Sequence, residues 1–235
     1  MRILAGTSGY SYPAWKGSFY PPGLPASRML AAYAARLPTV EINATFYRMP
    51  QARTLAAWRA GVPPAFVFAL KGPQRITHQK RLAGAAEDVA FFLRTAAELG
   101  GALGPILWQL PPTLRKDLAL LREFLVLLPR GGRFAFEFRH ASWWSDDVLA
   151  ALSGAGAALC IAEDENAAAP VAATAGFGYL RLRRADYDDA ALARWAASVR
   201  AQPWTDAFVF FKHEDEARGP EYALHFGAIA LQSPP

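Results

Sequence analysis

Apolar and polar residues alternate through the segment 134–139, in which three phenylalanines are interleaved with Ala135, Glu137 and Arg139. A repeat of two residues is typical of a β-strand, because successive side chains point to opposite faces. The phenylalanine face suits packing beneath covering helices. The other face begins with a small residue and ends with a carboxylate and a guanidinium. We therefore expect it to line a barrel interior that becomes polar at the carboxyl ends of its strands.

Seven further short apolar segments read as strands, and most of them are followed by a helical stretch. The predicted strands are 3–7, 39–43, 65–71, 104–109, 157–162, 177–183 and 207–212. The predicted helices are 28–37, a helix ending near residue 60, 84–99, 114–128, 145–153, 189–200 and 221–231, with Ser27 as the N-cap of the first. The connection 166–175 is too poor in long apolar residues to be predicted as a helix.

Strands that alternate with helices pair in parallel, because parallel neighbours need crossover connections. Eight such units in 235 residues predict an α/β fold, a single TIM (β/α)8-type barrel that spans residues 1–235 as one domain. An open doubly wound sheet is the alternative, but it would more often have a glycine-rich turn after the first strand. The segment 6–9, G-T-S-G, lacks the spacing of a dinucleotide-binding fingerprint.

Composition narrows the class of protein. The chain is 53% hydrophobic, which is enough for a sizeable core, and its net charge is +5. This charge allows an anionic partner such as nucleic acid, but the arginines are dispersed, and we favour an ordinary soluble protein. Cys160 is the single cysteine, so it cannot form an internal disulfide, and its apolar neighbours predict a small core residue. We find no signal peptide and no apolar run of the ~20 residues that cross a bilayer, so we expect a cytoplasmic protein without membrane association.

The strand pattern also predicts which polar side chains point into the barrel. If the phenylalanines face the helices, polar residues near the carboxyl ends of several strands point inward, where the active sites of this fold lie. These residues are Glu41, Asn43, Lys71, Gln109, Glu137, Arg139, Arg181 and Arg183. Glu163 and Asp164, which end the sixth strand, are expected in the same basin. A satisfied network of buried ion pairs is the alternative, but hydrophobic side chains would fill that space at a lower free-energy cost.

The residue types in this basin suggest separate roles. The catalytic candidates are Glu137 and Glu41 as acid and base, with His78 or His140 as a proton shuttle. The substrate-binding candidates are Asn43, Tyr47, Lys71, Gln109, Arg139, Trp143, Asp164, Arg181 and Arg183. The arginines and the lysine would hold a phosphate or a carboxylate, because guanidinium forks match those groups. For each histidine taken alone, a loop position without a function is the alternative.

Two other kinds of site are considered from the sequence. Carboxylates of the basin and a histidine could ligate a metal, but no ligand pair has a diagnostic spacing, so we predict no metal and leave the cofactor unknown. The aromatic loop 10–20 could stack on a sugar or a base, or it could cap the barrel end as a hydrophobic lid. With Phe46, Tyr47, Trp143 and Trp144 it would give the basin an aromatic wall.

Five longer motifs run in order from residue 3 to beyond residue 210. They are G-T-S-G-Y-S-Y-x-x-W-x-G-x-F-Y-P, V-E-I-N-A-T-F-Y-R-M-P, F-A-L-K-x-P-x-x-I-T-H, L-G-P-I-L-W-Q-L-P-P and F-E-F-R-H-x-S-W. Together they resemble the YecE-like proteins, the domain of unknown function 72 family. The resemblance implies a TIM barrel and brings no established reaction, substrate or cofactor. The residues on these motifs are Glu41, Asn43, Thr45, Phe46, Tyr47, Lys71, Thr77, His78, Gln109, Glu137, Arg139, His140 and Trp143.

The chain departs from this family pattern after the eighth predicted strand. Many relatives have an F-N-N-x stretch there, whereas this chain has F-F-K-H-E-D-E at 210–216. Lys212, His213 and Glu214 are therefore given no shared role, and substrate preference can differ from that of relatives.

Three functions stay open at this point. The one we favour is an enzyme that acts on a small anionic or sugar-containing substrate at the C-terminal barrel mouth, with hydrolysis as the reaction class by elimination of cofactor motifs. A nucleic-acid-binding or processing protein is suggested by the positive charge, the basic loop 75–81 and nearby aromatic residues. A non-catalytic ligand sensor would use the same basin. The oligomeric state is not indicated by the sequence.

Overall fold

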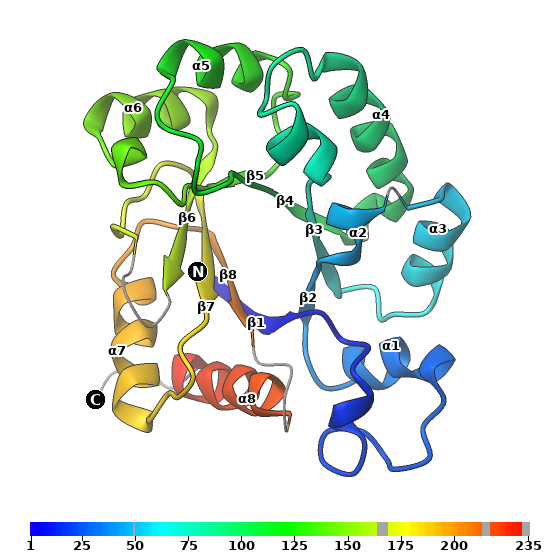
Figure 1. Ribbon diagram of the computed structural model, residues 1–235. Helices are drawn as coiled ribbons and strands as arrows, with labels where there is room; N and C mark the ends of the chain where they lie inside the picture. Colours follow the sequence, from blue (N-terminus) through cyan, green and yellow to red (C-terminus); the bar gives the residue numbers. More distant parts are fainter. Residues whose placement is uncertain (49, 164–168, 213–216, 232–235) are drawn as a thin grey trace.

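In the computed structural model, eight parallel strands close into a barrel in the order β1 to β8, which Figure 1 shows end-on. The structure describes residues 1–48, 50–163, 169–212 and 217–231. Each strand pairs in parallel with the next, and β8 pairs with β1. The strands are β1 Arg2–Ser8, β2 Thr39–Ile42, β3 Val67–Lys71, β4 Leu103–Gln109, β5 Phe134–Glu137, β6 Ala158–Glu163, β7 Phe177–Leu182 and β8 Asp206–Phe211. The predicted TIM barrel is therefore confirmed.

Helices surround the barrel, as Figure 1 shows. They are α1 Ala26–Ala34, α2 Ala44–Tyr47, α3 Ala52–Ala60, α4 Ala86–Ala96, α5 Leu118–Val126, α6 Asp146–Ala155, α7 Asp189–Arg200 and α8 Arg218–Leu231. A π-helical turn, Arg75–Gln79, follows β3, and short 3-10 helices occupy Pro13–Trp15, Ala97–Ala102 and Ala141–Trp143. No helix among the described residues is both long and apolar enough to cross a membrane.

The side chains of each strand divide between two hydrophobic layers, as the alternation predicts. Phe134, Phe136 and Phe138 pack with the helices in the outer layer, whereas Ala135 lies in the barrel interior. Small residues of β3, β5 and β6 leave room in the interior for aromatic rings of β7 and β8. The inner layer consists of Leu4, Val67, Ala69, Leu107, Ala135, Ala158, Cys160, Phe177, Tyr179, Phe208 and Phe210. Cys160 is thus a buried core residue, as its apolar surroundings predict.

The amino-terminal end of the barrel has its own charged cluster. Asp206, at the start of β8, accepts hydrogen bonds from Arg2 of β1 at 3.0 Å and from Arg133, just before β5, at 2.9 Å. Both arginines are largely or partly exposed, with 54% and 40% of their side-chain surface in solvent. These pairs join strands that are far apart in the sequence and lie at the opposite end of the barrel from the candidate site.

Several predicted element boundaries are wrong by a few residues, for local reasons. The N-cap of α1 is Pro25, whose extended backbone starts the helix at Ala26, so that Ser27 lies inside the first turn. The helix predicted at 114–128 begins only at Leu118, because the Asp117 side chain accepts a hydrogen bond from the backbone N–H of Leu120 and caps it there. The last helix begins at Arg218 rather than at residue 221.

The aromatic loop after β1 packs against the protein itself. Trp15 is fully buried, and its ring centroid lies 5.8 Å from that of Phe19 and 6.1 Å from that of Tyr20. Phe19 in turn meets Tyr33 of α1 at 5.9 Å. These three loop rings are buried in the outer hydrophobic layer, so their faces are not available for stacking on a ligand.

Candidate functional site

One buried arginine joins two buried glutamates at the carboxyl end of the barrel. Arg181 of β7 donates from Nη2 to Glu41 of β2 at 2.9 Å and from Nη1 to Glu137 of β5 at 2.6 Å. Both carboxylates are fully buried, and 3% of the arginine side chain is exposed. Strands that are distant in the sequence place these groups together, because the parallel strands of a closed barrel all end in one basin.

The remaining acceptor positions of Glu41 are largely occupied. Ser8 of β1 donates its hydroxyl to Oε1 at 2.7 Å, and Tyr179 of β7 donates to Oε2 at 2.6 Å. Burial raises the pKa of Tyr179, and the charge of Glu41 raises it further, so the phenol stays a neutral donor. Ser8 and Tyr179 were not among the predicted site residues, although both point inward by the same strand alternation that identifies Glu41.

Glu137 accepts hydrogen bonds from three side chains, Arg181 among them, and forms an ion pair with a fourth. Gln109 of β4 donates to Oε2 at 2.8 Å, Arg139 donates to Oε1 at 3.1 Å, and Arg183 lies 3.5 Å from Oε1. Burial by itself would raise the pKa of Glu137, but Arg181, the two further arginines and the Gln109 hydrogen bond together hold it well below its usual range. A carboxylate that is ionised, saturated and fully buried is suited to positioning the arginines rather than to exchanging a proton.

Lys71, at the end of β3, is buried without such a partner. Its Nζ lies 3.8 Å from the centroid of the Phe46 ring, and 8% of the residue is exposed. Among the described residues, no carboxylate lies within ion-pairing distance of it. Burial lowers the pKa of Lys71 to about 8, and the charge of Arg181 contributes in the same direction.

His78 lies on the π-helical turn after β3, against the other cations. Its ring packs edge-to-face with Phe46, with 4.9 Å between the ring centroids, and its Nδ1 lies 2.9 Å from the Thr77 hydroxyl. Burial lowers the pKa of His78, and the charges of Lys71 and Arg139 lower it further. The imidazole is therefore neutral near pH 7 and can accept or return a proton beside Lys71.

Other predicted residues lie apart from this cluster. The Trp143 ring stacks on Phe138 at 4.7 Å in the outer layer, and its indole N–H donates to the Leu114 carbonyl at 2.8 Å. The Nδ1 of His140 accepts from the backbone N–H of Ser142 and so caps a 3-10 helix. The placement of Trp143 in an aromatic wall of the basin is therefore wrong, because its ring is buried between other side chains of the outer layer.

The predicted residues at the ends of β2 and β6 have different surroundings. Asn43 precedes α2, and its Oδ1 is buried with no hydrogen-bond partner among the described residues, whereas Tyr47 is 72% exposed. Glu163 accepts from Tyr187 and Trp195 on the helix side, so its expected place in the basin is wrong. Asp164, His213 and Glu214 lie outside the described residues, and Lys212 directly follows β8.

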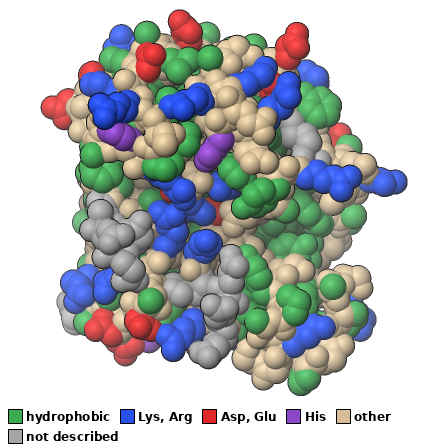
Figure 2. Space-filling view, in the orientation of Figure 1, with side chains coloured by type: hydrophobic (Ala, Val, Ile, Leu, Met, Phe, Trp, Pro, Cys, Tyr) green, Lys and Arg blue, Asp and Glu red, His purple; other side chains and the backbone are tan. Residues whose placement is uncertain are grey.

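A hollow of about 360 Å3 opens at the mouth beside Glu137. Arg139 and Arg183 line it together with the half-exposed Trp144, and the complete lining is Pro112, Glu137, Phe138, Arg139, Trp144, Ala162, Ala169 and Arg183. Figure 2 shows lysine and arginine side chains gathered at the centre of this face, over the barrel. No three His, Cys, Asp or Glu side chains form a possible metal site within the described part of the chain. The described side chains that line this hollow include two cations, Arg139 and Arg183, and one carboxylate, Glu137.

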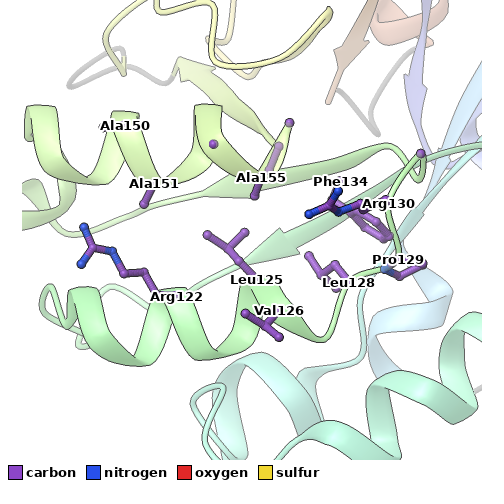
Figure 3. Close-up of a pocket in the computed structure, with 14 residues that line it drawn as sticks. Arg122, Leu125, Val126, Leu128, Pro129, Arg130, Phe134, Ala150, Ala151 and Ala155 are labelled. Atoms are coloured by element: carbon purple, nitrogen blue, oxygen red, sulfur yellow. The ribbon is translucent and has the colours of Figure 1, made fainter.

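A larger hollow of about 890 Å3 lies between α5 and α6, away from this cluster (Figure 3). Small and aliphatic residues such as Leu125, Val126 and Ala151 line it, together with Arg122 and Arg130. It contains no carboxylate and no histidine among its lining residues, so its size does not make it the better candidate for chemistry.

Comparison with known proteins gives the same architecture. Residues 4–233 match the family described as "Protein of unknown function DUF72". This chain belongs to the DUF72 family. Over 140 residues it is 31% identical to the UPF0759 protein YunF of Bacillus subtilis (strain 168), an alignment that covers 54% of this chain and 48% of that protein. The chain thus spans about half the length of the curated relative that it matches.

Solved structures of DUF72 proteins have the same fold. A DUF72 family protein from Thermotoga maritima MSB8 superposes with a TM-score of 0.88 at 25% identity, covering 99% of this chain and 100% of that one. A DUF72 family protein from Enterococcus faecalis V583 has a TM-score of 0.79 at 20% identity, covering 99% of this chain and 97% of that one. This second likeness shows a shared fold and nothing more.

Proposed function

We propose that this DUF72 protein is an enzyme that acts on a small anionic substrate at the carboxyl end of its barrel. The observation that supports this most is Lys71, a cation buried at the mouth that no carboxylate among the described residues pairs. Burying charge costs free energy, and a structural network would balance cations with carboxylates. An anion in the mouth would complete that balance.

Arg139 and Arg183 are the side chains that would hold the anion. Both line the hollow at the mouth, and the contact of Arg139 with Glu137 uses one N–H of a guanidinium that carries five. Arg181 already donates to two carboxylates and is better suited to holding them in place. A carboxylate or a phosphate, including that of a sugar phosphate, matches paired guanidinium groups in size and charge.

Lys71 and His78 are the groups suited to proton transfer in this proposal. Efficient acids and bases have pKa values near the working pH, and the lowered pKa of Lys71 moves it towards that range, whereas the lowered pKa of His78 favours its neutral, proton-accepting form. Glu137 and Glu41, the expected acid and base, are fully buried and occupied by their donors. We therefore assign to the two carboxylates the task of orienting the arginines.

The basic loop after β3 gives less support to nucleic-acid binding than its sequence suggests. Arg75 and Lys80 both pair with Asp88 of α4, at 2.9 and 2.7 Å, and Arg81 donates to the Thr113 carbonyl. Much of its positive charge is thus used within the fold. Binding to nucleic acid would also weaken steeply as salt rises.

Thermal unfolding with inorganic phosphate, lactate or glycerol 3-phosphate tests the anion site. We expect a saturable rise in Tm of about 2–6 °C with at least one of these anions, since a ligand that binds only the folded state stabilises it. Arg139→Gln should abolish the rise, and Arg122→Gln, in the distant hollow between α5 and α6, should retain it. No rise, or an equal rise in both variants, would contradict the site, and consumption of the bound compound would separate an enzyme from a sensor.

A further inference from the structure

We propose that Lys71 is a nucleophile that forms an imine with the carbonyl carbon of a small compound bearing a carboxylate or a phosphate. This inference rests on the proposed anion site and adds to it a reactive group and a substrate class. Glu41, Glu137 and Arg181 are paired with one another, whereas the Lys71 amine lies against the Phe46 ring.

The surroundings of Lys71 favour the neutral amine, which is the nucleophilic form. The residue is 8% exposed, and among the described side chains no carboxylate lies close enough to pair with it. Arg181 and Arg139 both disfavour a further positive charge at this place, although Glu41 and Glu137 partly offset them. With a pKa of about 8, roughly one in ten of these amines is neutral at pH 7, against far fewer for an exposed lysine.

The neighbouring arginines indicate which carbonyl compounds would reach this amine. Lys71 does not line the hollow beside Glu137. It lies close enough to Arg139, which lines that hollow, for the charge of Arg139 to lower the pKa of Lys71. Lys71 of β3 pairs in register with Leu107 of β4, and Gln109, two residues further along β4, pairs with Glu137 of β5. Gln109 and Glu137 therefore form a floor between the end of β3 and this hollow. A small compound with its anionic group at Arg139 and Arg183 would extend its carbonyl carbon over this floor towards Lys71.

The covalent step balances without an oxidant, a reductant or a second substrate. The neutral amine of Lys71 attacks the carbonyl carbon, a C–N bond forms, and the carbonyl π electrons move to oxygen, which takes up a proton as the nitrogen loses one. The oxygen takes a second proton from solvent, and the nitrogen lone pair expels it as water, leaving an imine that is protonated on nitrogen. His78, neutral and packed against the same Phe46 ring, is placed to accept the proton from nitrogen and return it to the departing oxygen. Attack of water on the imine reverses the sequence and frees the lysine.

The alternative role for Lys71 is that of a permanent cation that attracts the anion without bonding to it. Removing the lysine would lower the affinity for anions in either role, so binding data do not separate the two. Reductive trapping separates them, because a hydride donor reduces an imine to a stable secondary amine and leaves a simple ion pair unchanged.

The test uses the full chain at pH 8 with sodium cyanoborohydride and either pyruvate or dihydroxyacetone phosphate. Intact-mass measurement should show one reduced adduct per chain, and peptide mapping should place it on Lys71. Labelling there should exceed that of Lys16, Lys80, Lys116 or Lys212 by about tenfold or more, because a lysine with a pKa of about 8 is half neutral at this pH. The two probes distinguish a carboxylate next to the carbonyl from a phosphate one carbon away.

Matched variants and matched anions separate the possible outcomes. Lys71→Met should lose the adduct, and Lys16→Met, at an exposed position, should retain it. Adducts spread over the exposed lysines, or none at Lys71 while lactate or glycerol 3-phosphate still raises Tm, would overturn the imine and leave the anion site standing. No adduct at Lys71 and no rise in Tm with any anion would overturn both proposals. Mapping on the unmodified sequence keeps the result independent of how well any variant folds.

Discussion

Two parts of the barrel mouth bury positive charge in different ways. Where β2, β5 and β7 end, Arg181 bridges Glu41 and Glu137, and serine, tyrosine and glutamine donors fill the remaining positions. At the end of β3, Lys71 is buried almost as deeply, against an aromatic ring. The first arrangement stabilises its charges by mutual contact, whereas the second holds a charge that no carboxylate among the described residues pairs.

The difference separates framework from reactivity. A saturated ion-pair network holds each group in one protonation state and one orientation, as the lowered pKa of Glu137 shows. A buried amine without a carboxylate partner is destabilised in its charged form, and this destabilisation makes it reactive near neutral pH. In this interpretation the glutamates orient arginines around a hollow, and Lys71 carries the chemistry.

Removing the bridge should have the largest effect on stability. Arg181→Met leaves two buried carboxylates without their shared partner, so we expect the free energy of unfolding to fall by about 3–5 kcal/mol. Urea denaturation followed by circular dichroism measures this. A loss of free energy of unfolding below about 1 kcal/mol would show that the Arg181 network does not stabilise the fold, which would contradict this interpretation.

Neutralising Glu137 should cost somewhat less, with a distinct pH dependence. We expect Glu137→Gln to lower the free energy of unfolding by about 2–4 kcal/mol near pH 7, since the amide keeps one acceptor oxygen but not the charge. The folded-state pKa of Glu137 is depressed, so its stabilisation is complete above the unfolded value of about 4.3 and is lost as pH falls through the folded value. Unfolding curves at pH 7 and pH 3 should therefore differ less for the variant than for the original chain.

Removing the unpaired lysine should act in the opposite direction. We expect Lys71→Met to raise the free energy of unfolding at pH 7 by about 1–3 kcal/mol, because an apolar side chain replaces a desolvated cation. The folded-state pKa is lowered, so the unfolded chain binds more protons between about pH 8 and about pH 10.4, and the original chain gains stability across that window. The advantage of the variant should shrink accordingly. A variant less stable than the original at pH 7 would place Lys71 in the framework instead.

The smallest effect is expected at the other end of the barrel. Arg2→Met removes one of the two arginines on Asp206, and more than half of that side chain is exposed, so the loss should stay within about 1 kcal/mol. Urea denaturation of this variant, measured in the same way, gives the reference value for an exposed ion pair. A loss as large as that of Arg181→Met would mean that burial does not set the scale of these charge effects.

The barrel could be predicted from the sequence because its signals are local. Side-chain direction alternates residue by residue along a strand, so the phenylalanines of 134–138 and their neighbours assign the outer and inner faces without knowledge of any partner. The same rule places Glu163 of β6 outside the barrel, because Cys160 lies in the interior three residues earlier. The expectation that Glu163 lies in the basin is therefore wrong, since strand direction and not residue type decides where the side chain points.

What the chain determined by itself is therefore the closed barrel and the set of polar groups at its mouth. Tertiary structure alone decided which of these groups meet: the contact between Arg181 and Glu41 spans 140 residues, and the withdrawal of Trp143 into the outer layer depends on the Leu114 carbonyl. It also left Lys71 with an aromatic neighbour instead of a carboxylate. The physical reason is that alternation is a property of one strand, whereas the pairing of charges depends on how eight strands close and in what register.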